Sequence, residues 1–151
     1  MKLQNLLDIE LPIIQAPLAG VQNSALTIAV SNAGGLGSLP CAMLSLDKLK
    51  EELETIKSHT DKPYNLNFFC HQSPEPDATR ETTWRRTLGP YYQEFGIDPD
   101  SIPDGLGRAP FTEDIVNLIA PYAPPLVSFH FGLPKPDLLE RVKFWGAKVL
   151  S

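Results

Sequence analysis

Short apolar runs alternate with helical segments along nearly the whole chain, and this alternation restricts the possible folds more than any other feature of the sequence. Apolar runs bounded by turn residues predict strands at residues 11–17, 36–41, 64–70, 125–131 and 147–151. Periodic or capped segments predict helices at residues 25–33, from 45 to the turn at 60–63, at 82–95, at 112–120 and from 136 to 146. Strands that alternate with helices and are joined by short turns form a parallel sheet. The sequence therefore predicts an α/β fold.

Capping residues and apolar spacing support these helix boundaries. Asn23 or Ser24 can cap the first helix, and Gly34 ends it. Ser45 begins the second helix, whose apolar side chains have helical spacing and predict a single buried stripe of Leu46, Leu49, Leu53 and Ile56. Thr112 is predicted to cap a later helix, because acidic residues fill the turn that follows it.

Polar residues near the ends of three predicted strands distinguish two parallel-sheet architectures. Gln15, Asn67 and His130 all lie toward the carboxyl ends of their strands. This placement fits the ring of strand ends in a (β/α)8 TIM barrel better than the single crevice of a doubly wound open sheet, which stays as the alternative. We expect an incomplete N-terminal portion of the barrel, with about four βα units and the start of a fifth strand.

His130 is the strongest candidate for a catalytic residue, because it ends an otherwise apolar strand just before a Gly-Leu-Pro turn. A polar side chain in a buried parallel strand needs a hydrogen-bond partner, a ligand or a role in proton transfer. The alternative is a hydrogen-bonded structural histidine, and Asn67 has the similar alternative of satisfying backbone groups at a strand end. His59 and His71 have no partner in the sequence, so they are predicted to lie on the surface.

Charge and cysteine content make several classes of partner and site improbable. The formal net charge is −5, and no face of clustered Lys and Arg is predicted, so neither nucleic acid nor a membrane surface is an expected partner. No apolar run of roughly 18 residues and no cleavable leader occur, so a soluble, cytoplasmic protein is expected. Cys41 and Cys70 lack the spacing of a zinc site and are predicted to be buried free thiols, with no metal.

Proline is unevenly distributed along the chain. Six of the prolines fall between residues 74 and 110. Proline at this density does not continue a regular sheet, so an irregular insertion is expected at about residues 71–111, within a single partial barrel domain that covers residues 1–151.

Four segments occur in a fixed order: PIIQAPLAGV at residues 12–21, AVSNAGGLGS at 29–38, NLNFF at 65–69 and SFHFGLP at 128–134. Together they resemble the nitronate monooxygenases, formerly called 2-nitropropane dioxygenases, over nearly the whole chain. The resemblance implies an FMN-binding TIM-barrel oxidoreductase that oxidises alkyl nitronates, of the propionate 3-nitronate type, with molecular oxygen. FMN-dependent enoyl-acyl-carrier-protein reductases share the first two motifs and are the alternative, but the His-Phe-Gly strand end separates the two families.

The resemblance also implies roles for particular residues. Ala16, Pro17 and Leu18 would pass their backbone along the flavin ring, Asn67 would form a hydrogen bond with the flavin, and His130 would stand beside the nitronate. Leu18 replaces a methionine that is usual in the family, which is a tolerable apolar exchange. A neutral His130 can take a proton from the carbon next to a nitro group, whereas a protonated one can stabilise or orient the anionic nitronate, the role we favour.

Chain length sets a further expectation. A (β/α)8 barrel usually takes about 250 residues and binds phosphate through loops after its seventh and eighth strands, so the chain of 151 residues is expected to be a truncated part of a longer enzyme. Such a part would bind FMN weakly and show little or no activity. Its open sheet edges also predict a homodimer or pairing with a missing C-terminal half. A non-enzymatic, self-associating half-barrel module is the third alternative.

Overall fold

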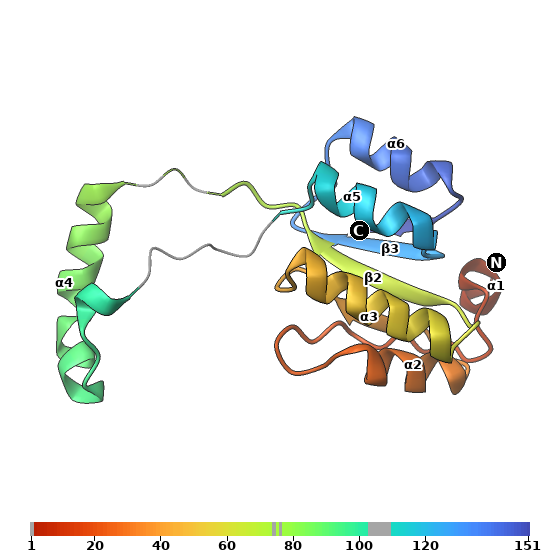
Figure 1. Cartoon of the computed structure of the whole chain (residues 1–151), viewed down its shortest axis with the longest axis horizontal. Coiled ribbons are helices and arrows are strands. Elements are labelled where there is room, and N and C mark those ends of the chain that lie inside the picture. Colours follow the sequence, from red (N-terminus) through yellow and green to blue (C-terminus); the bar gives the residue numbers. More distant parts are fainter. Residues whose placement is uncertain (1, 74, 76, 103–109) are drawn as a thin grey trace. The chain divides into compact units, whose positions relative to one another are not determined.

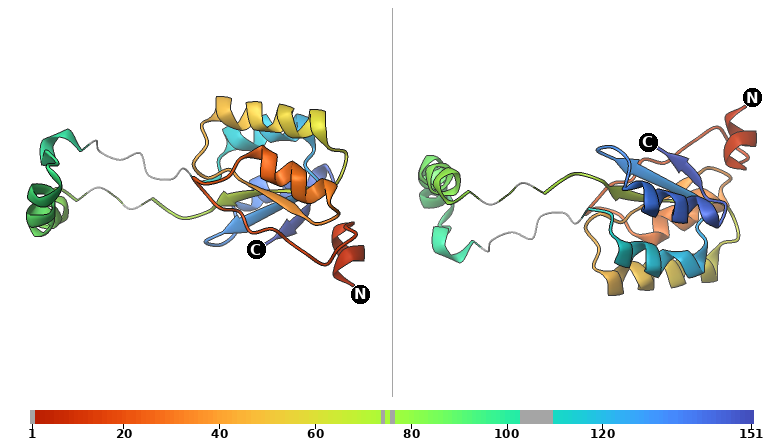
Figure 2. Two further views of the ribbon diagram at one scale, coloured as in Figure 1. Left: turned by 90° about the horizontal axis from the view of Figure 1, so that it is seen from below. Right: turned by 90° about the horizontal axis from the view of Figure 1, so that it is seen from above.

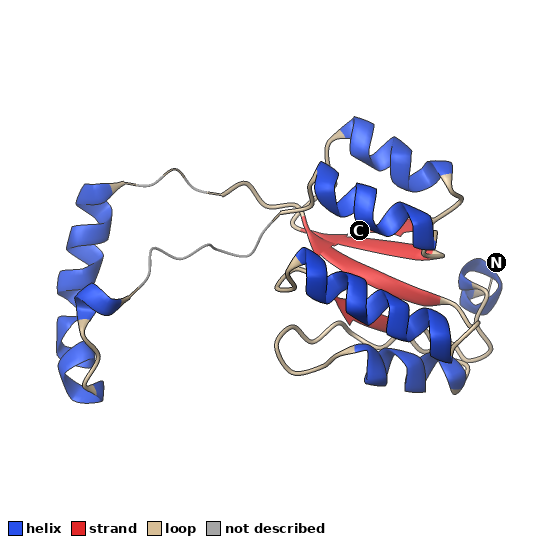
Figure 3. Ribbon diagram, in the orientation of Figure 1, coloured by secondary structure: helices blue, strands red, loops and turns tan. Residues whose placement is uncertain are grey.

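Four parallel strands form the central sheet, in the order β1-β2-β3-β4 (Figures 1 and 3). The strands are β1 (Gly37–Pro40), β2 (Tyr64–Phe69), β3 (Leu126–His130) and β4 (Lys148–Leu150). The structure is a computed structural model that describes residues 2–73, 75, 77–102 and 110–151. Within these residues the strand order follows the chain without the reversal that a doubly wound sheet requires, so the open-sheet alternative gains no support.

Four helices pack in chain order against one face of this sheet (Figure 2). They are α2 (Ser24–Asn32), α3 (Leu46–His59), α5 (Glu113–Ile119), which continues into the 3₁₀ turn η2 (Ala120–Tyr122), and α6 (Pro136–Phe144). Leu53 and Ile56 of α3 and Val142 of α6 are completely buried in the core beneath them. The predicted stripe on α3 is confirmed apart from its first member, since Leu46 is exposed.

Side chains of the strands alternate between two environments, as the pleat of a sheet requires. Leu66, Phe68 and Phe129 belong to the core under the helices. Their neighbours Asn65 and Asn67 therefore point to the opposite face, as the alternation of polar and apolar residues at positions 65–68 predicts.

The opposite face is covered at the amino ends of the strands by the first residues of the chain. The short helix α1 (Leu3–Leu7) contributes Leu7, which packs with Ile9, Leu36 and Leu126 in a second apolar cluster. Burial at this end leaves the carboxyl ends of the strands as the open part of the face.

Local signals explain where α2, α3 and β1 begin. The Asn23 side chain accepts a hydrogen bond from the Ala25 N–H at 3.0 Å, and the Ser45 side chain accepts one from the Lys48 N–H at 3.2 Å. Gly37 lies directly under α2, where a Cβ atom would overlap the carbonyl oxygen of Thr27. Only glycine permits this approach of strand to helix.

Two sequence predictions about local structure are wrong. Residues 11–17 do not form a buried strand, because they pair only through a parallel bridge between Ile14 and Leu36, and Ile13 and Ile14 are exposed. The segment lies at the edge of the sheet, where no second neighbour covers it. Thr112 precedes α5 at the N-cap position, but its side chain makes no capping hydrogen bond.

Residues 72–107 form a separate compact unit. Its helix α4 (Ala78–Phe95) begins before the predicted position because the Asp77 side chain accepts hydrogen bonds from the Thr79 and Arg80 N–H groups. Gly96, at a φ of 64°, ends the helix, and the 3₁₀ turn η1 (Pro99–Ser101) follows. Among the described residues, no helix has the length and apolar character needed to cross a membrane.

Candidate functional site

A row of uncharged polar side chains crosses the open face of the sheet. Hydrogen bonds link its amide side chains to two serines of neighbouring strands, and we call it the polar row: Gln15, Gln22, Ser38, Asn65, Asn67 and Ser128. Asn65 donates to the Ser38 hydroxyl at 3.1 Å and to the Ser128 hydroxyl at 2.9 Å. Asn67 donates to the same Ser128 hydroxyl at 2.9 Å. The row thus connects β1, β2 and β3 through side chains.

Gln15 and Gln22 connect residues 11–17, at the lateral edge of the sheet, to this row. Gln15 Oε1 accepts from the Ser38 N–H at 2.9 Å, and its Nε2 donates to Gln22 Oε1 at 2.8 Å. Gln22 in turn donates to the Ser38 carbonyl at 2.5 Å. Gln15, which the sequence predicts as a polar strand end, therefore holds the segment that contains Ala16 against β1.

Ala16 and Leu18 are exposed, and Pro17 between them is half-buried. The Leu18 N–H donates to Gln22 Oε1 at 3.1 Å, which fixes the path of the backbone. These residues follow the bridge at Ile14 and so lie at the carboxyl side of the sheet, toward which Asn67 and His130 also lie. The accessible stretch from Ala16 to Leu18, with its apolar side chains, and the partly exposed Asn67 amide therefore both lie at the carboxyl ends of the strands.

His130 ends β3 opposite Phe69 in the register with β2, and its side chain is exposed. Its carbonyl accepts a hydrogen bond from the Cys70 N–H at 2.9 Å, so the strand pairing fixes its backbone. The centroids of the Phe131 and Phe69 rings lie 4.2 and 5.8 Å from the imidazole. The imidazole thus has an apolar wall on the protein side and is accessible on the other.

Phe131 has a φ of 66°, in the left-handed region that a bulky residue rarely adopts. Gly132 follows with a φ of 99°. Strained backbone of this kind is concentrated at functional sites, where the surrounding structure maintains it. Here it turns the chain immediately after His130 and places the exposed Phe131 ring against the imidazole.

His71, which the sequence predicts on the surface without a partner, lies beside two aromatic rings of the strand ends. It is half-buried, and its ring centroid lies 6.3 Å from that of Phe69 and 6.2 Å from that of Phe131. Its Nδ1 atom is buried and has no hydrogen-bond partner among the described residues. The signal was its position two residues beyond Phe69, at the carboxyl end of β2. His59, by contrast, is exposed at the end of α3, as predicted.

Burial disfavours the thiolate form of both cysteines. Cys41 is buried and Cys70 is half-buried, and both are free thiols. Burial raises the pKa of Cys70 to about 11 and raises that of Cys41 still further. Across the residues that the structure describes, no group of three or more His, Cys, Asp and Glu side chains is arranged to hold a metal ion.

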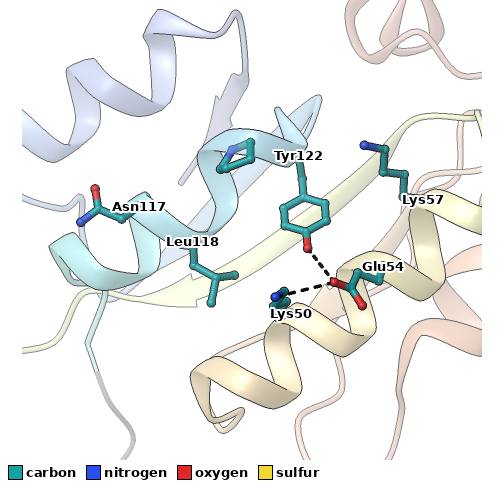
Figure 4. A pocket seen from close by; sticks show the side chains of 7 residues that line it. Lys50, Glu54, Lys57, Asn117, Leu118 and Tyr122 are labelled. Atoms are coloured by element: carbon teal, nitrogen blue, oxygen red, sulfur yellow. Dashed lines mark hydrogen bonds and ion pairs between the residues drawn. The ribbon is translucent and has the colours of Figure 1, made fainter.

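A pocket of about 540 Å³ lies on the helical side of the sheet, between α3 and the end of α5 (Figure 4). Glu54 accepts a hydrogen bond from the Tyr122 hydroxyl at 3.5 Å and lies 4.0 Å from the Lys50 ammonium group. Lys57 lies 5.9 Å from the centre of the Tyr122 ring. These charges are paired with one another and stand on the opposite face from the polar row, so the strand ends are the better candidate site.

Known proteins match this chain over nearly its full length. The family model described as "Nitronate monooxygenase" matches residues 1–151. A nitronate monooxygenase of Pseudomonas aeruginosa is 40% identical over 96% of this chain and 42% of its own length. One from Paraburkholderia phytofirmans is 38% identical over 97% of this chain and 40% of its own length. The chain therefore spans about two fifths of the length of these curated relatives.

Solved structures agree with this match. The nitroalkane oxidase from Streptomyces ansochromogenes superposes with a TM-score of 0.79 and 29% identity, over 99% of this chain and 41% of that one. A mutant form of FabK from Thermotoga maritima has a TM-score of 0.66 and 24% identity, over 97% of this chain and 37% of that one, and shows a shared fold alone. The α/β fold, the ordered motifs and these matches lead to one conclusion: the chain belongs to the nitronate monooxygenase family of oxidoreductases.

Proposed function

We propose that this chain supplies the N-terminal part of an FMN-dependent (β/α)8 barrel that oxidises alkyl nitronates of the propionate 3-nitronate type with molecular oxygen. The observation that carries the proposal is the convergence of three features at one edge of the sheet: the Ala16–Leu18 backbone, the Asn67 amide and His130. The barrel architecture is supported by the unreversed strand order and by helices on a single face.

The residues at this edge have the chemistry that a flavin ring needs. The ring is planar and apolar on its faces, and its polar edge carries hydrogen-bond acceptors and an N–H donor. The Asn67 amide nitrogen donates to Ser128, so its amide oxygen offers an acceptor for the ring N–H, and the accessible stretch from Ala16 to Leu18 offers an apolar surface. The buried Asn65 Oδ1, which accepts no hydrogen bond from the described residues, leaves a second acceptor in the same polar row.

When bound, the flavin would supply the oxidation step, which amino-acid side chains cannot perform. His130 would hold the nitronate. The substrate carbon is already deprotonated in a nitronate, so the histidine is more useful as an N–H donor toward the negatively charged nitro oxygens than as a base. The Phe69 and Phe131 rings beside it would exclude water and strengthen that contact.

The first test measures binding of the flavin ring. Because the assigned residues contact the ring and not the phosphate, lumiflavin and FMN should bind the chain with similar affinity. Quenching of the flavin fluorescence measures this binding. Asn67→Leu should weaken both equally, whereas Asn117→Leu, on the outer surface of α5, should weaken neither. Absence of quenching by either flavin at millimolar concentration, or equal effects of the two substitutions, would contradict the assignment.

The second test measures oxygen consumption with propionate 3-nitronate and FMN in the complete barrel that contains this chain, because the chain alone is expected to show little or no activity. His130→Asn should reduce the rate, and the identical exchange His59→Asn, on the exposed end of α3, should not. Consumption should need no reduced nicotinamide. A requirement for NAD(P)H with an enoyl thioester substrate would support the reductase alternative instead.

A further inference from the structure

Helix α4, in the unit of residues 72–107, carries an aromatic stripe that no described residue of this unit covers. Trp84, Tyr91 and Phe95 are 60%, 57% and 69% exposed, and Leu88 lies between them. The spacing of these four residues is four, three and four, so they lie on one face of the helix. This is the spacing of a seam between two paired helices.

The turn η1 does not cover the stripe. It is held to α4 by a hydrogen bond of 2.7 Å from Arg85 to the Pro99 carbonyl. Arg85 lies about 100° around the helix from Trp84, given 3.6 residues per turn. The turn therefore packs beside the stripe and leaves the aromatic rings exposed.

The sequence of α4 makes an unsupported helix marginal. None of its residues is buried, and Gly89 and Pro90 interrupt its centre, where glycine and proline are the least favourable residues. Helical stability in proteins comes mostly from packing of an apolar face. The stripe therefore needs a partner surface.

Charges beside the stripe identify a partner. Arg80 flanks it in the first half of the helix, and Glu94 flanks it on the same side in the last turn. In an antiparallel pair of α4 helices, the flank with Arg80 faces the flank with Glu94 of the other copy, twice by symmetry. A parallel pair would instead set this flank against the other flank of the second helix, so Arg80 and Glu94 would not meet.

We propose that two copies of this chain associate through antiparallel pairing of their α4 helices along the stripe of Trp84, Leu88, Tyr91 and Phe95. The contact is isologous and closes as a dimer. It involves neither the polar row nor a flavin, so it stands independently of the proposed function.

The test is analytical ultracentrifugation of the full chain over a range of concentrations. The wild-type chain should be in a monomer–dimer equilibrium. Trp84→Glu should weaken the dimer by about thirtyfold or more, because a charge would replace the largest apolar side chain of the contact. Circular dichroism should show that the sheet domain stays folded, since Trp84 lies outside it.

Charge reversal tests the antiparallel arrangement itself. Arg80→Glu and Glu94→Arg should each weaken the dimer, by about tenfold, because each creates two like-charge contacts. The double variant should restore it, and so should a mixture of the two single variants, whose charges complement each other. The matched control is Arg86→Glu, which makes the same change on the opposite face of α4 and should leave the dimer intact.

Three results would overturn the proposal. A wild-type chain that is monomeric at all concentrations would mean that the stripe is covered within its own chain or by another protein. An oligomer that Trp84→Glu leaves unchanged would place the contact elsewhere. A double charge reversal that fails to restore the dimer would exclude antiparallel pairing.

Discussion

Glu52 on α3 provides a quantitative test of how the helical layer is held together. Its side chain is buried, and Oε2 accepts a hydrogen bond from the Ser24 N–H, at the start of α2, at 2.8 Å. Oε1 lies 3.2 Å from the ammonium group of Lys48. Burial raises the pKa of Glu52, but the hydrogen bonds from Ser24 and the contact with Lys48 outweigh it and hold the pKa below 4.5.

We expect Glu52→Gln to lower the free energy of unfolding by about 1–2 kcal/mol at pH 7. A buried hydrogen bond to a charged acceptor contributes about 1.5–3 kcal/mol, and the glutamine amide oxygen keeps the weaker, neutral part of it. The matched control is Glu51→Gln, because Glu51 also contacts Lys48, at 2.9 Å, but is 67% exposed. That substitution should change the stability by less than about 0.5 kcal/mol.

The pH dependence checks the sign of this effect. A carboxyl whose pKa is lowered in the folded state stabilises the fold above its unfolded pKa, and the stabilisation is lost as the pH falls through the folded value. The difference between wild type and Glu52→Gln should therefore be full above pH 4.5 and shrink below it. Urea unfolding at pH 7, 5 and 3 measures it. An equal cost for Glu51→Gln, or a cost of Glu52→Gln that is as large at pH 3 as at pH 7, would refute the reasoning.

Two further predictions concern packing and thiol reactivity. Gly37→Ala should destabilise the chain by more than about 3 kcal/mol in urea unfolding, because its Cβ overlaps the Thr27 carbonyl, whereas Gly89→Ala on α4 should stabilise it slightly or have no effect. Equal effects of the two exchanges would contradict the close approach of α2 to β1. Cys70 should react slowly with iodoacetamide at pH 8, because its pKa is about 11, and Cys41 should react only on unfolding. Rapid alkylation of Cys41 in the native chain would argue against its burial.

Much of the fold follows from local signals that the sequence contains. Asn23 and Ser45 begin their helices through the capping hydrogen bonds that their side chains predict. The alternation of Asn65, Leu66 and Asn67 correctly assigns the two faces of β2, since successive side chains of a strand must point in opposite directions. The prediction of a buried strand at residues 11–17 was wrong, because the burial of this segment depends on a neighbouring strand and not on its own composition.

The candidate site was only partly accessible to the same reasoning. Asn67 and His130 were identified by their position at the ends of apolar strands, and their roles toward flavin and nitronate stay predictions. His71 escaped notice because its contacts with Phe69 and Phe131 join two different strand ends, which the sequence does not place together. The hydroxyl of Ser128, which joins Asn65 to Asn67, was equally unrecognisable from its apolar surroundings in the chain.

The sequence by itself determined the succession of strands and helices, most of their boundaries and the family motifs, because periodicity, caps and turn residues act over a few neighbouring positions. Only the tertiary structure decided which strand ends meet, that the polar row spans three strands, and that Glu52 of α3 holds the start of α2. These contacts join residues that lie far apart in the chain. Their existence depends on the register between strands and on the packing of helices, which no local pattern encodes.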